Sequence, residues 1–190
     1  GHIKIHDPES GAVFVNKRNA IHYENMSIAL AESVANQGQG FISSMAFGNG
    51  GTSVDPTGII TYLTPNSTGT NASLYNQTFT KIVDDRSVSN LDPQRNKIET
   101  RHVNGTNYTD VVVTCLLDYG EPNGQDATDT ASASDSLYVF DELGLVSYAS
   151  SGTGKLLTHV IFHPVQKSLN RLIQIDYTVR VQSLTGFNEG

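Results

Sequence analysis

The stretch Ile173-Gln-Ile-Asp-Tyr-Thr-Val-Arg-Val-Gln182 decides the fold, because apolar and polar side chains alternate along it. Successive side chains of an extended strand point to opposite faces, so the alternation predicts that the β-type run 169–182 is a strand with one buried and one solvated face. A second β-type run, 156–163, precedes it, and the small-residue turn Ser150-Ser-Gly-Thr-Gly-Lys155 precedes that run. We therefore expect the stretch 140–182 to form strands joined by turns.

Strand signals continue upstream. Further β-type runs lie at 41–47, 59–63, 77–83, 98–103 and 108–118. The last two flank Asn104-Gly105, which is the strongest short hairpin signal in the chain. The continuous apolar run Val111–Leu117 is typical of a strand at the centre of a sheet.

One helix is expected, over residues 21–35. Asn19 or Asn25 is the expected N-cap, and Gly38 stands where a left-handed C-cap belongs. Its predicted buried face holds residues that recur at helical spacing: Met26, Ala29, Leu30, Ser33 and Val34. Many strands with one helix predict a mainly β (α+β) fold, a β-sandwich or jelly-roll-like domain over residues 19–190.

Two segments are expected to lie outside the core. Residues 1–18 are predicted to form an extended N-terminal arm that contacts a neighbouring subunit through Ile3, Ile5, Val13 and Phe14. Residues 121–136 are rich in Gly, Ala, Ser, Thr and Asp. Such a stretch buries little apolar surface, so we expect a flexible surface loop there.

Composition limits the classes of partner. Of the 190 residues, 37% are hydrophobic and 16% charged, and the net charge is −7. Nucleic-acid binding needs clustered Lys and Arg, which are absent, and no apolar stretch is long enough for a membrane span. The only cysteine, Cys115, lies in an apolar run and is expected to be a buried, unreactive thiol. Without a disulfide, we expect folding in a reducing compartment.

Catalytic and metal-binding motifs are missing. On a regular strand His159 and His163 share a face, but they would lie about 13 Å apart, too far for one metal ion. We expect them at a subunit contact instead. The segment Gly152-Thr-Gly-Lys155 lacks the flanking residues of a phosphate loop and is read as a turn. The pairs Asp84-Asp85 and Asp141-Glu142 are adjacent in sequence, so their side chains should point to opposite faces of a strand.

No nucleophile, base and orienting partner can be assembled from the sequence, so we expect no catalytic residues and no cofactor. A weak calcium site in the loop 121–136 is a lesser alternative, because three carboxylates occur there without EF-hand spacing: Asp126, Asp129 and Asp135.

Several segments together resemble small virion structural proteins of tailed bacteriophages. They are 16–26, 45–52, 107–115, 118–122, 140–145 and 156–171. Residues 140–182 also resemble phage collar and fibre-attachment domains. The resemblance implies a non-enzymatic role, with many copies assembled around a symmetry axis and contacts to other virion proteins.

Three functions therefore remain in view. The first is a virion component assembled in the bacterial cytoplasm as a homo-oligomer, at the neck or collar, with capsid decoration or the tail as alternatives. The second is a glycan-binding β-sandwich module, in which some of the eight Tyr would replace the missing Trp as stacking residues. The third is a hydrolase whose site the sequence motifs do not reveal.

Overall fold

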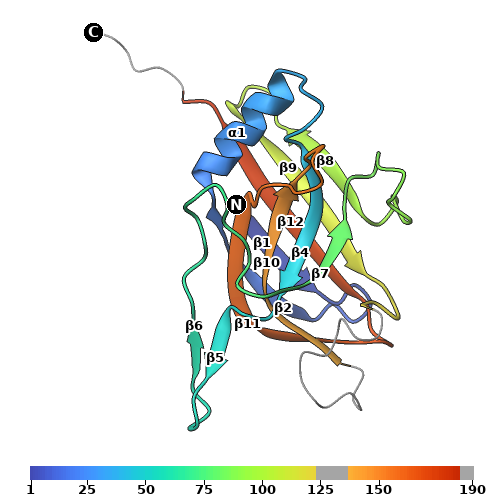
Figure 1. Ribbon diagram of the computed structural model, residues 1–190. Helices are drawn as coiled ribbons and strands as arrows, with labels where there is room; N and C mark the ends of the chain where they lie inside the picture. The colour runs from blue at the N-terminus through green and yellow to red at the C-terminus, as the bar shows by residue number, and fades with distance from the viewer. Residues whose placement is uncertain (123–136, 185–190) are drawn as a thin grey trace.

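The computed structural model describes residues 1–122 and 137–184. In these residues two five-stranded antiparallel sheets pack face to face (Figure 1). The first sheet has the order β2-β1-β12-β9-β8, with bounds Val13–Arg18, His2–His6, Ile173–Gln182, Tyr108–Leu117 and Lys97–His102. The second has the order β3-β11-β10-β4-β7, with bounds Ala20–Ile21, Thr158–Ser168, Leu137–Ser147, Ile42–Gly48 and Gln77–Ile82.

The core lies between the sheets and consists of the inward side chains of both. Alternation along β12 buries Ile173, Ile175 and Tyr177 completely, as the sequence predicts. An aromatic group from the second sheet faces them, and in it Phe47 meets Phe140 edge-on with ring centroids 5.4 Å apart. The predicted mainly β, sandwich-like α+β fold is confirmed.

Strand pairing follows the predicted turns. Asn104-Gly105 joins β8 to β9, and Gly105 has φ +85°, a conformation that glycine adopts without strain. β9 lies between β12 and β8, so the apolar run of β9 is inside its sheet, as expected. Gly152-Thr-Gly-Lys155 lies in the connection of the antiparallel pair β10–β11, as a turn between strands should.

The prediction that residues 1–18 form an extended arm is wrong, because these residues form β1 and β2 of the sandwich. β1 is hydrogen-bonded between β2 and β12, and it buries Ile3 and Ile5 completely. The two isoleucines alternate with polar residues, which is the strand pattern, and burial in the core uses their apolar surface. Phe14 is half-buried under the guanidinium of Arg171, so Ile3, Ile5 and Phe14 are not free for a neighbour.

The helix α1, Tyr23–Val34, begins and ends inside the predicted range. Its N-cap is His22, whose side chain accepts the N–H of Asn25, rather than Asn19 or Asn25. The first left-handed residue after the helix is Asn36 at φ 53°, and Gly38 is left-handed as well, at φ 70°, two residues further on.

Only part of the predicted helix face is buried. Ala29 is buried as expected, whereas Leu30 is 41% exposed and Val34 is almost fully exposed. The other buried residue of the helix is Asn25, whose side-chain amide donates to the carbonyl oxygen of Leu156.

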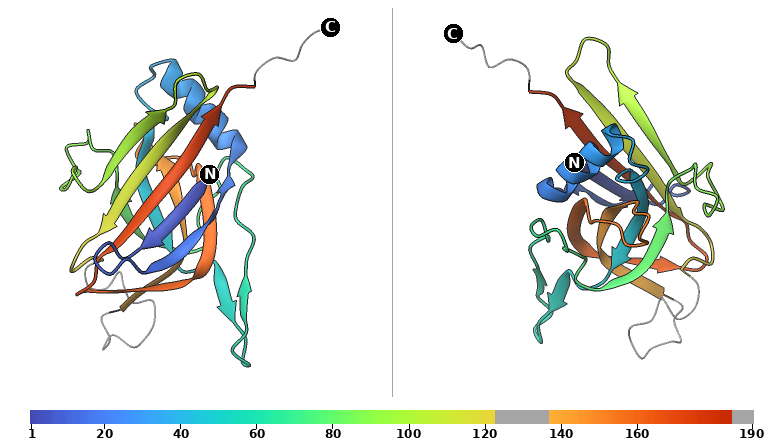
Figure 2. Two further views of the ribbon diagram at one scale, coloured as in Figure 1. Left: turned by 180° about the vertical axis from the view of Figure 1, so that it is seen from behind. Right: turned by 45° about the horizontal axis from the view of Figure 1, so that its top comes forward.

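The hairpin β5–β6, Thr52–Val54 with Ile60–Tyr62, stands apart from both sheets. It projects from one end of the molecule, while α1 lies across the other end (Figures 1 and 2). Of the predicted flexible loop 121–136, residues 123–136 lie outside the described residues. In the described part of the chain, no helix is long and apolar enough to cross a membrane.

Replacing Ile5 by Ala should lower the free energy of unfolding by about 2–5 kcal/mol, because it leaves a cavity between the sheets. The control is Val13→Ala on the edge strand β2, where Val13 is 51% exposed, and this change should stay within about 0.5 kcal/mol. Urea unfolding followed by circular dichroism measures both. Equal, small losses would contradict the placement of β1 in the core.

Candidate functional site

The connection between β4 and β7 is the least charged part of the chain. It runs over residues 49–76, contains the hairpin β5–β6, and is called the excursion below. Between Glu32 and Lys81 the only charged side chain is Asp55. The excursion is therefore an almost uncharged segment in a chain of net charge −7.

The excursion is fastened by two buried carboxylates of β10, Asp141 and Glu142. Asp141 accepts the N–H of Gly51 at 2.9 Å and both the N–H and the hydroxyl of Thr52, at 3.0 and 2.5 Å. Glu142 accepts the N–H groups of Gly50, Tyr75 and Asn76 at 3.1, 3.0 and 2.8 Å. Both ends of the excursion are thereby tied to one strand.

The expectation that adjacent carboxylates point to opposite faces is wrong for Asp141 and Glu142. Between Phe140 and Glu142 the pairing with β11 shifts from Val165 to Ile161, so β11 carries extra residues at this point. Such a β-bulge re-aims side chains locally. Both carboxylates consequently reach the neighbouring residues 50–52.

Close approach of the chains requires glycine at the base of the excursion. A Cβ at Gly48 would lie 2.4 Å from the carbonyl oxygen of Asn76 and 2.6 Å from Oε1 of Glu142. These distances are shorter than any normal contact, so a side chain here would push the excursion away from the carboxylate.

His159 completes the network with Glu142. Its Nε2 lies 2.8 Å from Oε2 of Glu142, and its Nδ1 accepts the N–H of Asn66 at 2.7 Å. Because Nδ1 is the acceptor, the proton is on Nε2 and is donated to the carboxylate. The imidazole is neutral in this arrangement, and both ring nitrogens are occupied.

The network keeps Glu142 ionised. Burial by itself would raise the pKa of Glu142, but hydrogen bonds from His159 and from the N–H groups of Asn76, Tyr75 and Gly50 outweigh it and the pKa is lowered. Glu142 and His159 are both fully buried. The pair therefore holds the excursion in place and has neither a free ring nitrogen nor solvent access for acid–base chemistry.

The structure separates the two histidines that the sequence analysis grouped. His159 is buried, whereas His163 is exposed and donates from Nδ1 to the carbonyl oxygen of Pro164 at 3.2 Å. His163 lies in the bulge of β11, which breaks the alternation on which the shared face depended. His159 is not at a surface, so of the predicted interface residues only Val13 and His163 are exposed.

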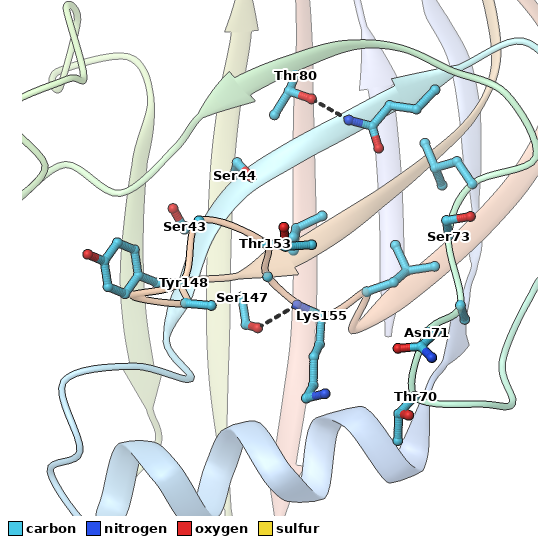
Figure 3. Close-up of a pocket in the computed structure, with 18 residues that line it drawn as sticks. Ser43, Ser44, Thr70, Asn71, Ser73, Thr80, Ser147, Tyr148, Thr153 and Lys155 are labelled. Carbon is cyan, nitrogen blue, oxygen red and sulfur yellow. Dashed lines mark hydrogen bonds between the residues drawn. The ribbon is translucent and has the colours of Figure 1, made fainter.

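An open cleft of about 800 Å³ adjoins the excursion (Figure 3). Its lining is mostly hydroxyl and amide side chains from β4, the excursion and the β10–β11 connection, including Ser43, Ser44, Asn71, Ser73 and Thr153. Among the described residues that line the cleft, only Lys155 is charged. Tyr148 forms one wall and stacks on Phe41, with ring centroids 4.9 Å apart and planes 8° apart. The cleft suits a neutral polar ligand.

Two further buried titratable groups, Cys115 and Lys167, are committed to the fold. Burial raises the pKa of Cys115 to about 12, as expected for an unreactive thiol. Burial lowers the pKa of Lys167 to about 8, and its ammonium donates to the carbonyl oxygens of Asp118 and Ser168.

Within residues 1–122 and 137–184, no three His, Cys, Asp or Glu side chains are arranged to hold a metal ion. The three carboxylates of the alternative calcium site, Asp126, Asp129 and Asp135, lie outside the described residues.

Glu142→Gln should reduce stability at neutral pH by about 1–3 kcal/mol, because the amide NH₂ cannot accept the buried N–H groups. The lowered pKa of Glu142 means that its contribution is present above the ordinary carboxyl pKa of 4.5 and is lost as the pH falls through the folded-state value. The difference between wild type and variant should therefore shrink below pH 4.5.

Urea unfolding at a series of pH values measures this difference. Asp85→Asn is the control, since Asp85 is exposed and an amide oxygen can still accept the N–H of Ile98. A wild-type advantage that stays constant into the acid range would show that the charge of Glu142 is not what fastens the excursion.

Comparison of the chain with protein-family models, with curated proteins and with solved structures found no match.

Proposed function

We propose that this chain is a non-enzymatic structural component of a tailed bacteriophage virion and that it acts as a symmetric homo-oligomer. The proposal is supported by the resemblance of six segments to small virion structural proteins, described above. It is also supported by a surface suited to protein contacts, which is the observation that carries it.

That surface is the hairpin β5–β6 with the residues beside it. Val54 is 62% and Ile59 63% exposed, and Tyr62 and Leu63 are also exposed. A protruding apolar surface is a cost in water unless a partner covers it, and protein interfaces are depleted of charged residues at their centre. The hairpin combines both features, and buried carboxylates hold its base in one position.

The contact surface proposed here differs from the one expected from the sequence. Ile3 and Ile5 are buried in the core. In this proposal the excursion, and not the N-terminal segment, therefore contacts the neighbouring copy. Assembly through a surface segment of a folded domain leaves the sandwich intact as a rigid building block.

Within the particle we favour the neck or collar, because residues 140–182 resemble collar and fibre-attachment domains. Capsid decoration and the tail are the alternatives. Rings at the neck surround a single axis, whereas decoration and tail proteins repeat over a large surface or a long tube.

Quantitative mass spectrometry of purified virions of the encoding phage should therefore find this chain at about a dozen copies per particle. The major capsid protein, measured in the same digest, supplies the internal standard. Hundreds of copies would exclude the collar in favour of decoration or the tail, and absence from the particle would reject the virion role.

A glycan-binding module is the second candidate, and the polar cleft of Figure 3 is the observation that favours it. Sugars present hydroxyl groups and apolar ring faces, which Ser, Thr and Asn side chains and a flat aromatic ring can match. Tyr148 is 41% exposed beside the cleft and is held flat by Phe41.

A glycan array probed with labelled protein tests this candidate. Any ligand found should bind about two- to tenfold more weakly to Tyr148→Ala, because an aromatic contact is worth about 0.5–1.5 kcal/mol. Tyr119→Ala, an exposed tyrosine that does not line the cleft, should bind normally. An array without a hit, or equal loss in both variants, would remove the candidate.

A further inference from the structure

Two Asn-Gly pairs of the described residues lie in opposite surroundings. Asn104-Gly105 forms the tip of the hairpin β8–β9, and Asn49-Gly50 lies at the start of the excursion, directly after β4. A third pair, Asn123-Gly124, lies outside the described residues. Glycine has no Cβ that would keep its backbone nitrogen away from the preceding side chain, so the amide of an asparagine before glycine is open to attack by that nitrogen.

The reaction is a ring closure followed by hydrolysis. The backbone nitrogen of the glycine loses its proton to a base in solution and attacks Cγ of the asparagine, and ammonia leaves as a five-membered succinimide forms. Water then opens the ring at one of its two carbonyl groups, and the product is aspartate or isoaspartate. One water is consumed and one ammonia is released, without an oxidant or a reductant. The reaction therefore needs a free glycine N–H, a movable side-chain amide and water.

Asn104-Gly105 meets all three conditions. Both residues are exposed, and a Cβ at Gly105 would meet nothing within 4 Å. The turn is closed by the N–H of Thr106, which donates to the carbonyl oxygen of Val103 at 3.1 Å. That bond uses the outer peptides of the turn. In the described part of the chain, neither the N–H of Gly105 nor the Asn104 side chain has a hydrogen-bond partner.

Asn49-Gly50 fails the first two conditions. The N–H of Gly50 donates to Oε1 of Glu142 at 3.1 Å, and this carboxylate is buried and ionised. The negative charge opposes removal of the proton, and a hydrogen bond to a charged acceptor must break before the nitrogen can attack. The side chain is held as well, because Oδ1 of Asn49 accepts an N–H of the Asn76 amide at 2.5 Å.

We propose that Asn104 is a site of spontaneous deamidation in the folded protein, and that the Glu142 carboxylate protects Asn49 from the same reaction. The inference goes beyond the virion role proposed above and does not depend on it. The product carboxylate is ionised at neutral pH and adds one negative charge to the net charge of −7. Isoaspartate also adds a methylene group to the backbone of the turn 103–106.

Peptide mapping of the full chain tests the proposal. Folded protein and protein unfolded in guanidinium chloride are incubated side by side in a mildly alkaline buffer. A chymotryptic digest cuts after Phe47 and Tyr108, so Asn49, Asn104 and Asn123 fall in separate peptides. Tandem mass spectrometry measures the converted fraction of each asparagine, and a sample digested before incubation supplies the background.

In the folded protein Asn104 should convert at least about tenfold faster than Asn49, because Asn49 can react only after a charge-assisted hydrogen bond breaks. In guanidinium chloride the two should convert at similar rates, since the unfolded chain presents the same dipeptide at both positions.

Glu142→Gln supplies the third arm of the experiment. Without the negative charge beside Gly50, Asn49 should convert faster than in the wild type, while Asn104 keeps its wild-type rate and reports that the domain is folded. Asp85→Asn removes an exposed carboxylate instead, and it should leave both rates unchanged.

Each outcome bears on one part of the inference. If Asn104 stays intact in the folded protein but converts in guanidinium chloride, it is not a modification site. Equal conversion of Asn49 and Asn104 in the folded protein would overturn the protection of Asn49. An Asn49 rate that is unchanged in Glu142→Gln would show that the carboxylate is not the protecting group.

Discussion

The placement of the excursion depends on the hydrogen bonds that Asp141 and Glu142 accept from its backbone. The excursion has no core of its own, since its hairpin has two strands of three residues each, and an isolated two-stranded hairpin is marginal in water. Apart from the carboxylates, Leu74 anchors it by packing with Ala46 and Leu156. Buried carboxylates are costly unless they are fully hydrogen-bonded. Here both carboxylates are hydrogen-bonded, and they specify one position for the segment.

That arrangement depends in turn on the irregular stretch of β11. Phe162, His163 and Pro164 lie opposite Asp141, where a regular ladder would have one residue. Proline has no N–H to give to a ladder, so a bulge is one of the few places in a sheet where it fits. The bulge turns both carboxylates towards the excursion and leaves His163 in solvent while His159 stays inside. One local departure from strand geometry thus creates the anchor.

Sequence patterns predicted the regular parts of this structure and missed the irregular ones. The period-2 alternation in β12, the apolar run of β9 and the Asn104-Gly105 turn depend on neighbouring residues alone, and they were correct. The same rule, applied to His159 and His163 or to Asp141 and Glu142, failed because it assumes an unbroken ladder. Pro164, directly after the β-type run 156–163, was the available signal for a bulge. The roles of Asn25 and His22 depend on partners distant in sequence, Leu156 and Gly69, which no local pattern can reveal.

The side chains of the N-terminal residues are compatible with two different predictions, an arm or a strand of the sandwich. Ile3 and Ile5 suit an arm that seeks a partner as well as a strand that completes its own sheet, because both need apolar surface on alternate positions. In the structure all of β1, residues 2–6, pairs with residues 174–178 of β12, and this pairing places the two isoleucines in the core. Once those residues are buried inside the domain, part of the remaining exposed apolar surface lies on the hairpin β5–β6, at Val54, Ile59 and Tyr62, and part at the end that carries α1, at Leu30 and Val181. The burial of Ile3 and Ile5 in the core thus follows from the pairing of β1 with β12.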